Sequence, residues 1–227
     1  MTRVLVTRTL PGGDGPGSPL ARLHEALGAN NVEVWAGDAP PSPEDVRRMA
    51  VGCTGLLTML TERVDAALLD AVPGVRAVAN MAVGYDNIDV PACSERGVLV
   101  TNTPGVLTEA TADMTWALLL AAARRLPEGR DAIEGATWGP WHPTWLLGHE
   151  VTGRTLGIVG PGRIGAAVAR RAAGFDMTVL YAGRSPRPDF PGEYVPLDEL
   201  LERSHYVSIH VPLSDGTRAM CDASFFA

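Results

Sequence analysis

The sequence predicts an α/β protein with two doubly wound parallel sheets of the Rossmann or flavodoxin-like kind, the second of them incomplete. Two observations predict this fold class. Short apolar segments alternate with helical segments at a spacing typical of parallel strands that are joined by helices. A glycine-rich turn, Gly160–Gly165, also follows one apolar segment and opens a helix. The chain has 227 residues, of which 46% are hydrophobic and 20% charged, so it can form one large domain or two modest ones.

The first hundred residues contain four predicted strands, at 4–6, 32–35, 55–58 and 75–81. Helices are expected at 19–27 and 42–49 between them. Ser42 is expected to cap the second helix, because a serine hydroxyl can accept a hydrogen bond from a free N–H group of the first turn. We therefore assign residues 1–100 to a first domain and residues 101–227 to a second.

The longest predicted helix runs from Thr108 to Leu126. Its apolar residues fall on more than one face, so we expect packing on both sides. Such a helix can bridge two domains, form a subunit interface or lie inside one domain. The segment from Trp138 to Leu147 follows it and contains three tryptophans. It is expected to be either a packed surface loop or a loop that covers a partner subunit or a substrate site.

A second α/β unit begins near Gly153. Strands are predicted at 156–159, 177–181 and 206–211, with a further short strand at 194–195. Helices are predicted at 164–173 and 196–203. A complete dinucleotide-binding domain has about six strands, so this one is expected to be truncated at its C-terminal end.

Charge and cysteine content narrow the function classes. The net charge of −7 argues against a nucleic-acid partner or an anionic membrane surface. Cys53, Cys93 and Cys221 are far apart, so neither a metal site nor a disulfide framework is expected, and all three are expected to be buried. No signal peptide and no run of eighteen apolar residues is present, which predicts a cytoplasmic protein.

The turn at 160–165 has the form G-x-G-x-x-G, which in this context predicts dinucleotide binding. Gly160 allows a tight turn, Gly162 lets the backbone approach a pyrophosphate, and Gly165 lets helix and strand pack closely. The start of the helix then offers free N–H groups to the anion. The alternative is a glycine turn with no ligand.

The end of the next strand predicts which dinucleotide is bound. An NAD site has an acidic residue about twenty positions after the first glycine. Here the segment is Leu-Tyr-Ala-Gly-Arg-Ser, which ends in Arg184 and Ser185 and contains no carboxylate. An arginine fork and a hydroxyl attract a 2′-phosphate. The sequence therefore predicts NADPH in preference to NADH.

Several longer stretches carry a resemblance to a known family. They are NMAVGYDNIDVPACSERGVLVTNTPGVLTEATAD from Asn80, LLGHEVTGRTLGIVGPGRIG from Leu146, YAGRS from Tyr181 and HVPLSDGTRAM from His210. With them the whole chain resembles the D-isomer-specific 2-hydroxyacid dehydrogenases, and among these the glyoxylate/hydroxypyruvate reductases. The resemblance implies a homodimer that reduces glyoxylate or hydroxypyruvate with NAD(P)H to a D-2-hydroxy acid.

The resemblance also implies roles for individual residues. The first domain would bind the 2-keto acid, with the carboxylate on backbone N–H groups, and the second would bind the cofactor. The dimer would form through the long helix and the tryptophan segment, which would close the partner's site. Matching positions for the substrate are Leu60, Val83, Gly84 and Trp141. Matching positions for the cofactor are Thr108, Gly160, Gly162, Arg163, Ile164, Gly165, Arg184, Ser185, Val211, Pro212 and Thr217.

The family's acid–base machinery is expected beyond the end of this chain. Its arginine, glutamate and histidine lie after the point that matches DASFFA, so no catalytic residue is assigned here. His210 ends a predicted strand but matches a non-catalytic position of the family. We therefore expect this chain to be inactive by itself. The alternatives are an inactive dinucleotide-binding fragment, or another member of the family such as a phosphoglycerate dehydrogenase.

Overall fold

The computed structural model describes residues 2–226 of the chain. The chain divides into two compact units, Met1–Pro104 and Gly105–Ala227. The division lies close to the boundary that the sequence places near residue 100. Each unit has its own parallel sheet and its own hydrophobic cores, so the α/β fold class with two parallel sheets is confirmed.

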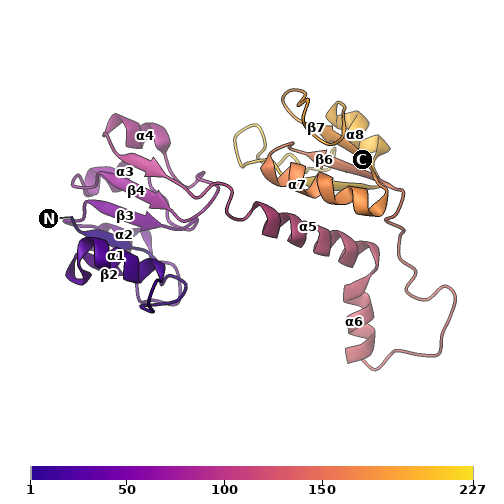
Figure 1. Ribbon diagram of the computed structural model, residues 1–227, viewed down its shortest axis with the longest axis horizontal. Coiled ribbons are helices and arrows are strands. Elements are labelled where there is room, and N and C mark those ends of the chain that lie inside the picture. The colour runs from indigo at the N-terminus through magenta and orange to yellow at the C-terminus, as the bar shows by residue number, and fades with distance from the viewer. Residues whose placement is uncertain (1, 227) are drawn as a thin grey trace. The chain divides into compact units, whose positions relative to one another are not determined.

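The sheet of the first unit has five parallel strands in the order β2-β1-β3-β4-β5 (Figure 1). The strands are β1 (Val4–Val6), β2 (Val32–Val34), β3 (Gly55–Thr58), β4 (Ala77–Asn80) and β5 (Leu99–Thr101). This is the flavodoxin-like order, in which the chain reverses direction across the sheet between β1 and β3. Ligands of such sheets bind at the carboxyl ends of the strands beside that reversal.

Alternate residues of the strands point to opposite faces of this sheet, and each face has a core. Leu5 and Leu56 belong to a core with α2 (Pro43–Met49), α3 (Ala66–Ala71) and α4 (Val90–Glu95). Their neighbours Val6 and Leu57 belong to a second core with α1 (Pro19–Leu27). Helices thus cover both faces, as a doubly wound sheet requires.

Side-chain caps fix where these helices begin. Ser42 accepts a hydrogen bond from the Asp45 N–H group, and the Asp45 carboxylate accepts one from the Ser42 N–H group, so the predicted cap is confirmed as a complete capping box. Asp65 and Asp89 cap α3 and α4 with their own side chains. The elements α3, α4 and β5 were not predicted. The helices α3 and α4 have six residues each, which is too short to show a helical period, and β5 has no buried residue.

The sheet of the second unit has four parallel strands in the order β8-β7-β6-β9. They are β6 (Thr155–Val159), β7 (Thr178–Ala182), β8 (Glu193–Tyr194) and β9 (Tyr206–Ile209). One face packs against α5 (Thr108–Ala123) and α7 (Arg163–Ala172), and the other against α8 (Leu197–Arg203). Short 3₁₀ turns follow α1 at Ala29–Asn31 and α7 at Ala173–Phe175. The reversal of strand order lies between β6 and β9.

The long predicted helix is wrong in length, and the described residues of one chain pack against only part of it. It ends at Ala123, and a separate helix α6 (Leu126–Glu134) begins after Arg125, whose φ of 54° breaks the helix. Met114 and Leu118 are 60% and 62% exposed, so only one face of α5 is packed in this chain. Thr108 is the first residue of α5 and does not cap it.

The tryptophan segment lies on the surface of its unit. Trp138 and Trp145 pack edge to face with 4.8 Å between ring centroids, whereas Trp141 is 86% exposed.

The prediction that the cysteines are buried is confirmed for Cys53 and Cys93, where burial raises the pKa of each thiol. It is wrong for Cys221, which is exposed. Within residues 2–226 there is no helix long and apolar enough to cross a membrane.

Candidate functional site

The glycine turn lies at the reversal between β6 and β9. Gly160 has a φ of 98°, and a Cβ atom placed there would lie 2.7 Å from the carbonyl carbon of His210. The main chain is held at this approach because the His210 N–H group donates to the Val159 carbonyl at 2.7 Å. Only glycine satisfies both the positive φ and the close contact.

The other two glycines of the turn serve different purposes. A Cβ at Gly165 would lie 2.4 Å from the Gly160 carbonyl oxygen, so this glycine lets α7 pack against the turn. A Cβ at Gly162 would meet nothing within 4 Å, and the φ of −80° suits any residue. Nothing inside the described chain therefore requires glycine at position 162. A ligand lying over the turn would require it, which fits the pyrophosphate of a dinucleotide.

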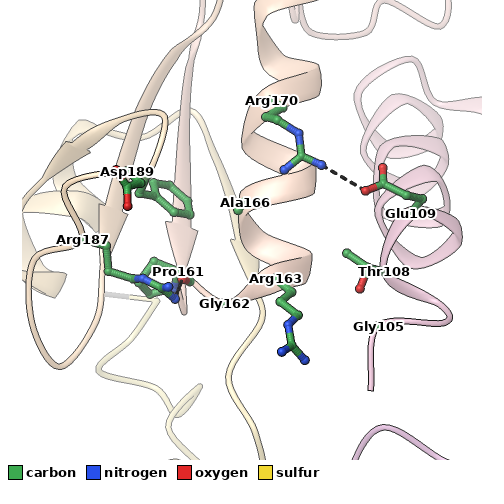
Figure 2. A pocket seen from close by; sticks show the side chains of 11 residues that line it. Gly105, Thr108, Glu109, Pro161, Gly162, Arg163, Ala166, Arg170, Arg187 and Asp189 are labelled. Carbon is green, nitrogen blue, oxygen red and sulfur yellow. Dashed lines mark hydrogen bonds and ion pairs between the residues drawn. The ribbon is translucent and has the colours of Figure 1, made fainter. Parts of the chain in front are cut away.

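A cavity of about 450 Å³ opens beside this turn (Figure 2). The turn and the start of α7 contribute Gly162 and Arg163, and the start of α5 contributes Thr108. The structure thus brings these three predicted cofactor residues together. The loop after β7 adds Arg187 and Phe190.

The start of α5 is fixed to α7 at the rim of this cavity. Glu109 pairs with Arg170 at 3.0 Å and with Arg171 at 2.8 Å (Figure 2 shows the first pair), and Arg171 also pairs with Asp113 at 2.7 Å. The hydrogen bonds to Glu109 and Asp113 raise the pKa of the Arg171 guanidinium. Such exposed pairs contribute little to stability individually. They do orient the residues that line the cavity.

The loop after β7 contains the predicted phosphate-binding residues. Arg184 and Ser185 are exposed, and among the described residues neither side chain makes a hydrogen bond or an ion pair. No role was predicted for Arg187 from the sequence, although it is a second arginine in the same short loop. Its guanidinium donates to the Pro161 carbonyl at 2.7 Å, and its N–H group donates to the Tyr181 hydroxyl at 2.8 Å. Arg187 thereby fastens this loop to the glycine turn.

The remaining predicted cofactor residues lie in the first turn of α7 or after β9, outside the cavity lining. Ile164 and Gly165 belong to α7. Thr217 closes a turn of its own, because its hydroxyl donates to the Pro212 carbonyl at 2.6 Å and accepts from the Ser214 N–H group at 2.9 Å. Val211 packs against the core beneath α8.

His210 is the histidine at the carboxyl end of a described strand, and burial lowers its pKa below the ordinary 6.5. Between the lowered pKa and 6.5 the unfolded chain binds more protons than the folded one, so stability rises with pH. We expect the free energy of unfolding to be highest above pH 6.5 and to fall as the pH is lowered below it. His210→Gln is expected to reduce this fall, in urea titrations at several pH values. Equal pH dependence in wild type and His210→Gln would contradict the assignment.

The predicted substrate residues of the first unit lie at the carboxyl edge of its sheet. A Cβ at Gly84 would lie 4.0 Å from the Leu60 Cδ2 atom, so the loops after β3 and β4 meet there. Val83 is half-buried, while Gly84 and Leu60 are exposed. Trp141 belongs to the second unit, and its side chain is exposed.

The comparisons with known proteins agree with this geometry. Residues 116–227 match the family model described as "D-isomer specific 2-hydroxyacid dehydrogenase, NAD binding domain". The chain is 48% identical over 223 residues to the glyoxylate reductase of Korarchaeum cryptofilum, covering 96% of this chain and 65% of that protein. The chain therefore spans about 65% of the length of that curated relative.

Two solved structures show the same architecture. The TT0316 protein from Thermus thermophilus superposes with a TM-score of 0.88 at 44% identity, covering 99% of this chain and 69% of that one. A putative D-isomer specific 2-hydroxyacid dehydrogenase from Polaromonas sp. JS6 66 superposes with a TM-score of 0.83 at 32% identity. The match covers 95% of this chain and 67% of that one.

The two parallel sheets and the glycine turn at a strand reversal define an α/β protein of the dinucleotide-binding class. The relatives define it more narrowly. The chain belongs to the D-isomer specific 2-hydroxyacid dehydrogenase family, and it is similar to glyoxylate reductases.

Proposed function

We propose that this chain binds a nicotinamide dinucleotide and a small 2-keto acid, and that it serves the reduction of glyoxylate or hydroxypyruvate to the D-2-hydroxy acid. The observation that carries the proposal is the glycine turn at the reversal between β6 and β9, where Gly162 leaves the start of α7 open to a ligand. The family model and the glyoxylate reductases to which the chain is similar support the same reaction class. A bound nicotinamide would supply the hydride.

The chain's own residues would bind the cofactor at three places. The N–H groups at the start of α7 would hold the pyrophosphate, since the Gly162 cap has no side chain to occupy them. Thr108 lines the other wall of the cavity. Arg184 and Ser185 would hold a 2′-phosphate, which favours NADPH over NADH.

Arg184→Ala is expected to weaken NADPH binding about tenfold, because a charge-assisted hydrogen bond contributes about 1.5–3 kcal/mol. NADH binding should change little, because NADH lacks the 2′-phosphate. Isothermal titration of both dinucleotides into the 227-residue chain measures this. Arg130→Ala is the matched control, since Arg130 is an exposed arginine that pairs with Glu134 on α6. Tighter binding of NADH than of NADPH by the wild type would refute the preference.

A binding function without turnover is the second candidate, and His210 favours it. Its pKa is lowered by burial and its Nε2 atom lies 2.8 Å from the Ser208 hydroxyl, so it is a poor proton donor near neutral pH. We propose that residues 1–227 alone bind NADPH but do not reduce a 2-keto acid. Oxidation of NADPH in the presence of glyoxylate, measured as a loss of the reduced nicotinamide's absorbance, would contradict this.

We also propose a homodimer in which α5 and the tryptophan segment meet a second copy. The exposed side chains of Met114 and Leu118 on α5 and of Trp141 in the tryptophan segment support it, because a partner subunit could bury these apolar groups. Sedimentation velocity measures the association directly. The cytoplasmic location and the absence of a nucleic-acid partner stay predictions from the sequence.

A further inference from the structure

The loop between β4 and α4 has an unusual main-chain arrangement. The carbonyl oxygens of residues 82–84 each accept a hydrogen bond from elsewhere in the unit. In order, the donors are the Thr103 N–H group, the Asn102 side-chain amide and the Asn80 side-chain amide, each at 2.9 Å. Three consecutive peptide carbonyls are thus turned toward the ends of β4 and β5.

This arrangement fixes where the N–H groups point. The chain has no cis peptide bond among the described residues, and in a planar trans peptide the N–H and C=O bonds point in opposite directions. The N–H groups of Val83 and Gly84 therefore point away from residues 102–103, and that of Tyr85 points away from Asn80. Within residues 2–226 none of these three N–H groups has an acceptor. Gly84 and Tyr85 are also exposed, so a ligand can reach them.

Asn80 is itself held in one orientation. It is 2% exposed, and its Oδ1 atom accepts from the Thr58 hydroxyl at 3.1 Å, so its amide nitrogen must face the Gly84 carbonyl. Asn87 completes the network by donating to the Met59 and Glu62 carbonyls at 2.9 and 2.8 Å. The same buried polar cluster therefore fixes the turn that contains Leu60.

We propose that Asn102 and Asn80 are positioning residues, which turn the peptides of residues 82–85 so that their N–H groups face a bound carboxylate. We further assign the Tyr85 N–H group as a third donor beside those of Val83 and Gly84. The inference rests on the proposed function, because it takes the 2-keto acid carboxylate as the ligand. The physical basis of the inference is the direction of the peptide dipole. A peptide turned the other way would present its carbonyl oxygen to the carboxylate and repel it.

Oxalate, which carries the carboxylate of a 2-keto acid and is not reduced, is the probe. In ¹H–¹⁵N spectra of the 227-residue chain, oxalate is expected to shift the amide signals of Val83, Gly84 and Tyr85. Asn102→Ala should raise the oxalate dissociation constant about fivefold, in proportion to one lost orienting hydrogen bond. Asn102→Asp should raise it further, because it removes the donor and adds a negative charge. Asn102→Gln keeps an amide donor and should recover part of the affinity.

Asn31→Ala is the matched control. The Asn31 amide also donates to a backbone carbonyl, that of Leu27 at 2.7 Å, but away from the loop. A purely structural role for Asn102 would lower the melting temperature of Asn102→Ala as much as that of Asn31→Ala and leave oxalate affinity unchanged, which would overturn the inference. Absence of oxalate-induced shifts at residues 83–85 in the wild type would also overturn it. NADPH titration tests the proposed function separately, because the predicted cofactor residues lie in the second unit and this loop lies in the first.

Discussion

Replacing Gly162 with alanine is expected to weaken dinucleotide binding by about tenfold or more and to leave the fold intact. An added Cβ meets nothing within 4 Å in the described chain, and the backbone angles at this position suit alanine. The stability change should therefore stay within about 0.5 kcal/mol. The new methyl group would instead occupy the space in which a pyrophosphate approaches the turn. Isothermal titration with NADPH and a urea titration measure the two effects.

Gly165→Ala is the informative contrast, because it places the same methyl group elsewhere in the same turn. There the Cβ would lie 2.4 Å from the Gly160 carbonyl oxygen, a backbone atom that cannot move aside cheaply. We expect a loss of about 1–3 kcal/mol or more in the free energy of unfolding. If Gly162→Ala bound NADPH as tightly as the wild type, the turn would not be a dinucleotide site, whatever Gly165→Ala did.

These two variants show why the glycine turn could be predicted from the sequence. The pattern predicted a separate purpose for each glycine, and the contacts of Gly160 and Gly165 confirm two of them. The signal is local, because a strand, a turn and a helix follow one another directly in the chain. The role of Gly162 toward a ligand stays a prediction that only binding can test.

Other parts of the site depend on contacts that no local pattern reveals. Arg187 meets the Pro161 carbonyl across 26 positions of sequence, and Asn102 meets the Val83 carbonyl across 19. Each is an ordinary polar residue in a loop until the sheet brings its partner close. The break at Arg125 was missed for a different reason, since the left-handed conformation there belongs to a residue type that normally continues a helix.

Both sheets place their candidate ligand groups at the same kind of position. In the first unit the N–H groups after β4 lie at the carboxyl edge of the sheet, and in the second the glycine turn lies at the reversal between β6 and β9. In each case backbone N–H groups, not side chains, would bind the anion. Asparagine side chains orient the backbone in the first unit, and glycines let the backbone approach a ligand in the second.

Trp116→Ala is expected to be among the most destabilising substitutions in the second unit. Trp116 is 5% exposed, stacks on Phe175 with 4.6 Å between ring centroids, and donates to the Val168 carbonyl at 3.1 Å. Truncating a buried tryptophan costs about 3–5 kcal/mol, which corresponds to about 10 °C in melting temperature for a chain of this size. Trp116→Phe keeps an aromatic ring on Phe175 and loses the hydrogen bond, so it should cost about 1 kcal/mol plus a packing loss.

Met114→Ala, compared at a protein concentration at which the chain is a monomer, is the control on the exposed face of the same helix, where the change should stay within about 0.5 kcal/mol. The Trp116 variants also test how the cavity depends on α5, because that helix supplies Thr108 and Glu109 to its wall. At a temperature where Trp116→Ala is still folded, we expect its NADPH affinity to fall below that of Met114→Ala. Equal affinities would show that the start of α5 is not needed to hold the cofactor, and would restrict the site to the glycine turn and the loop after β7.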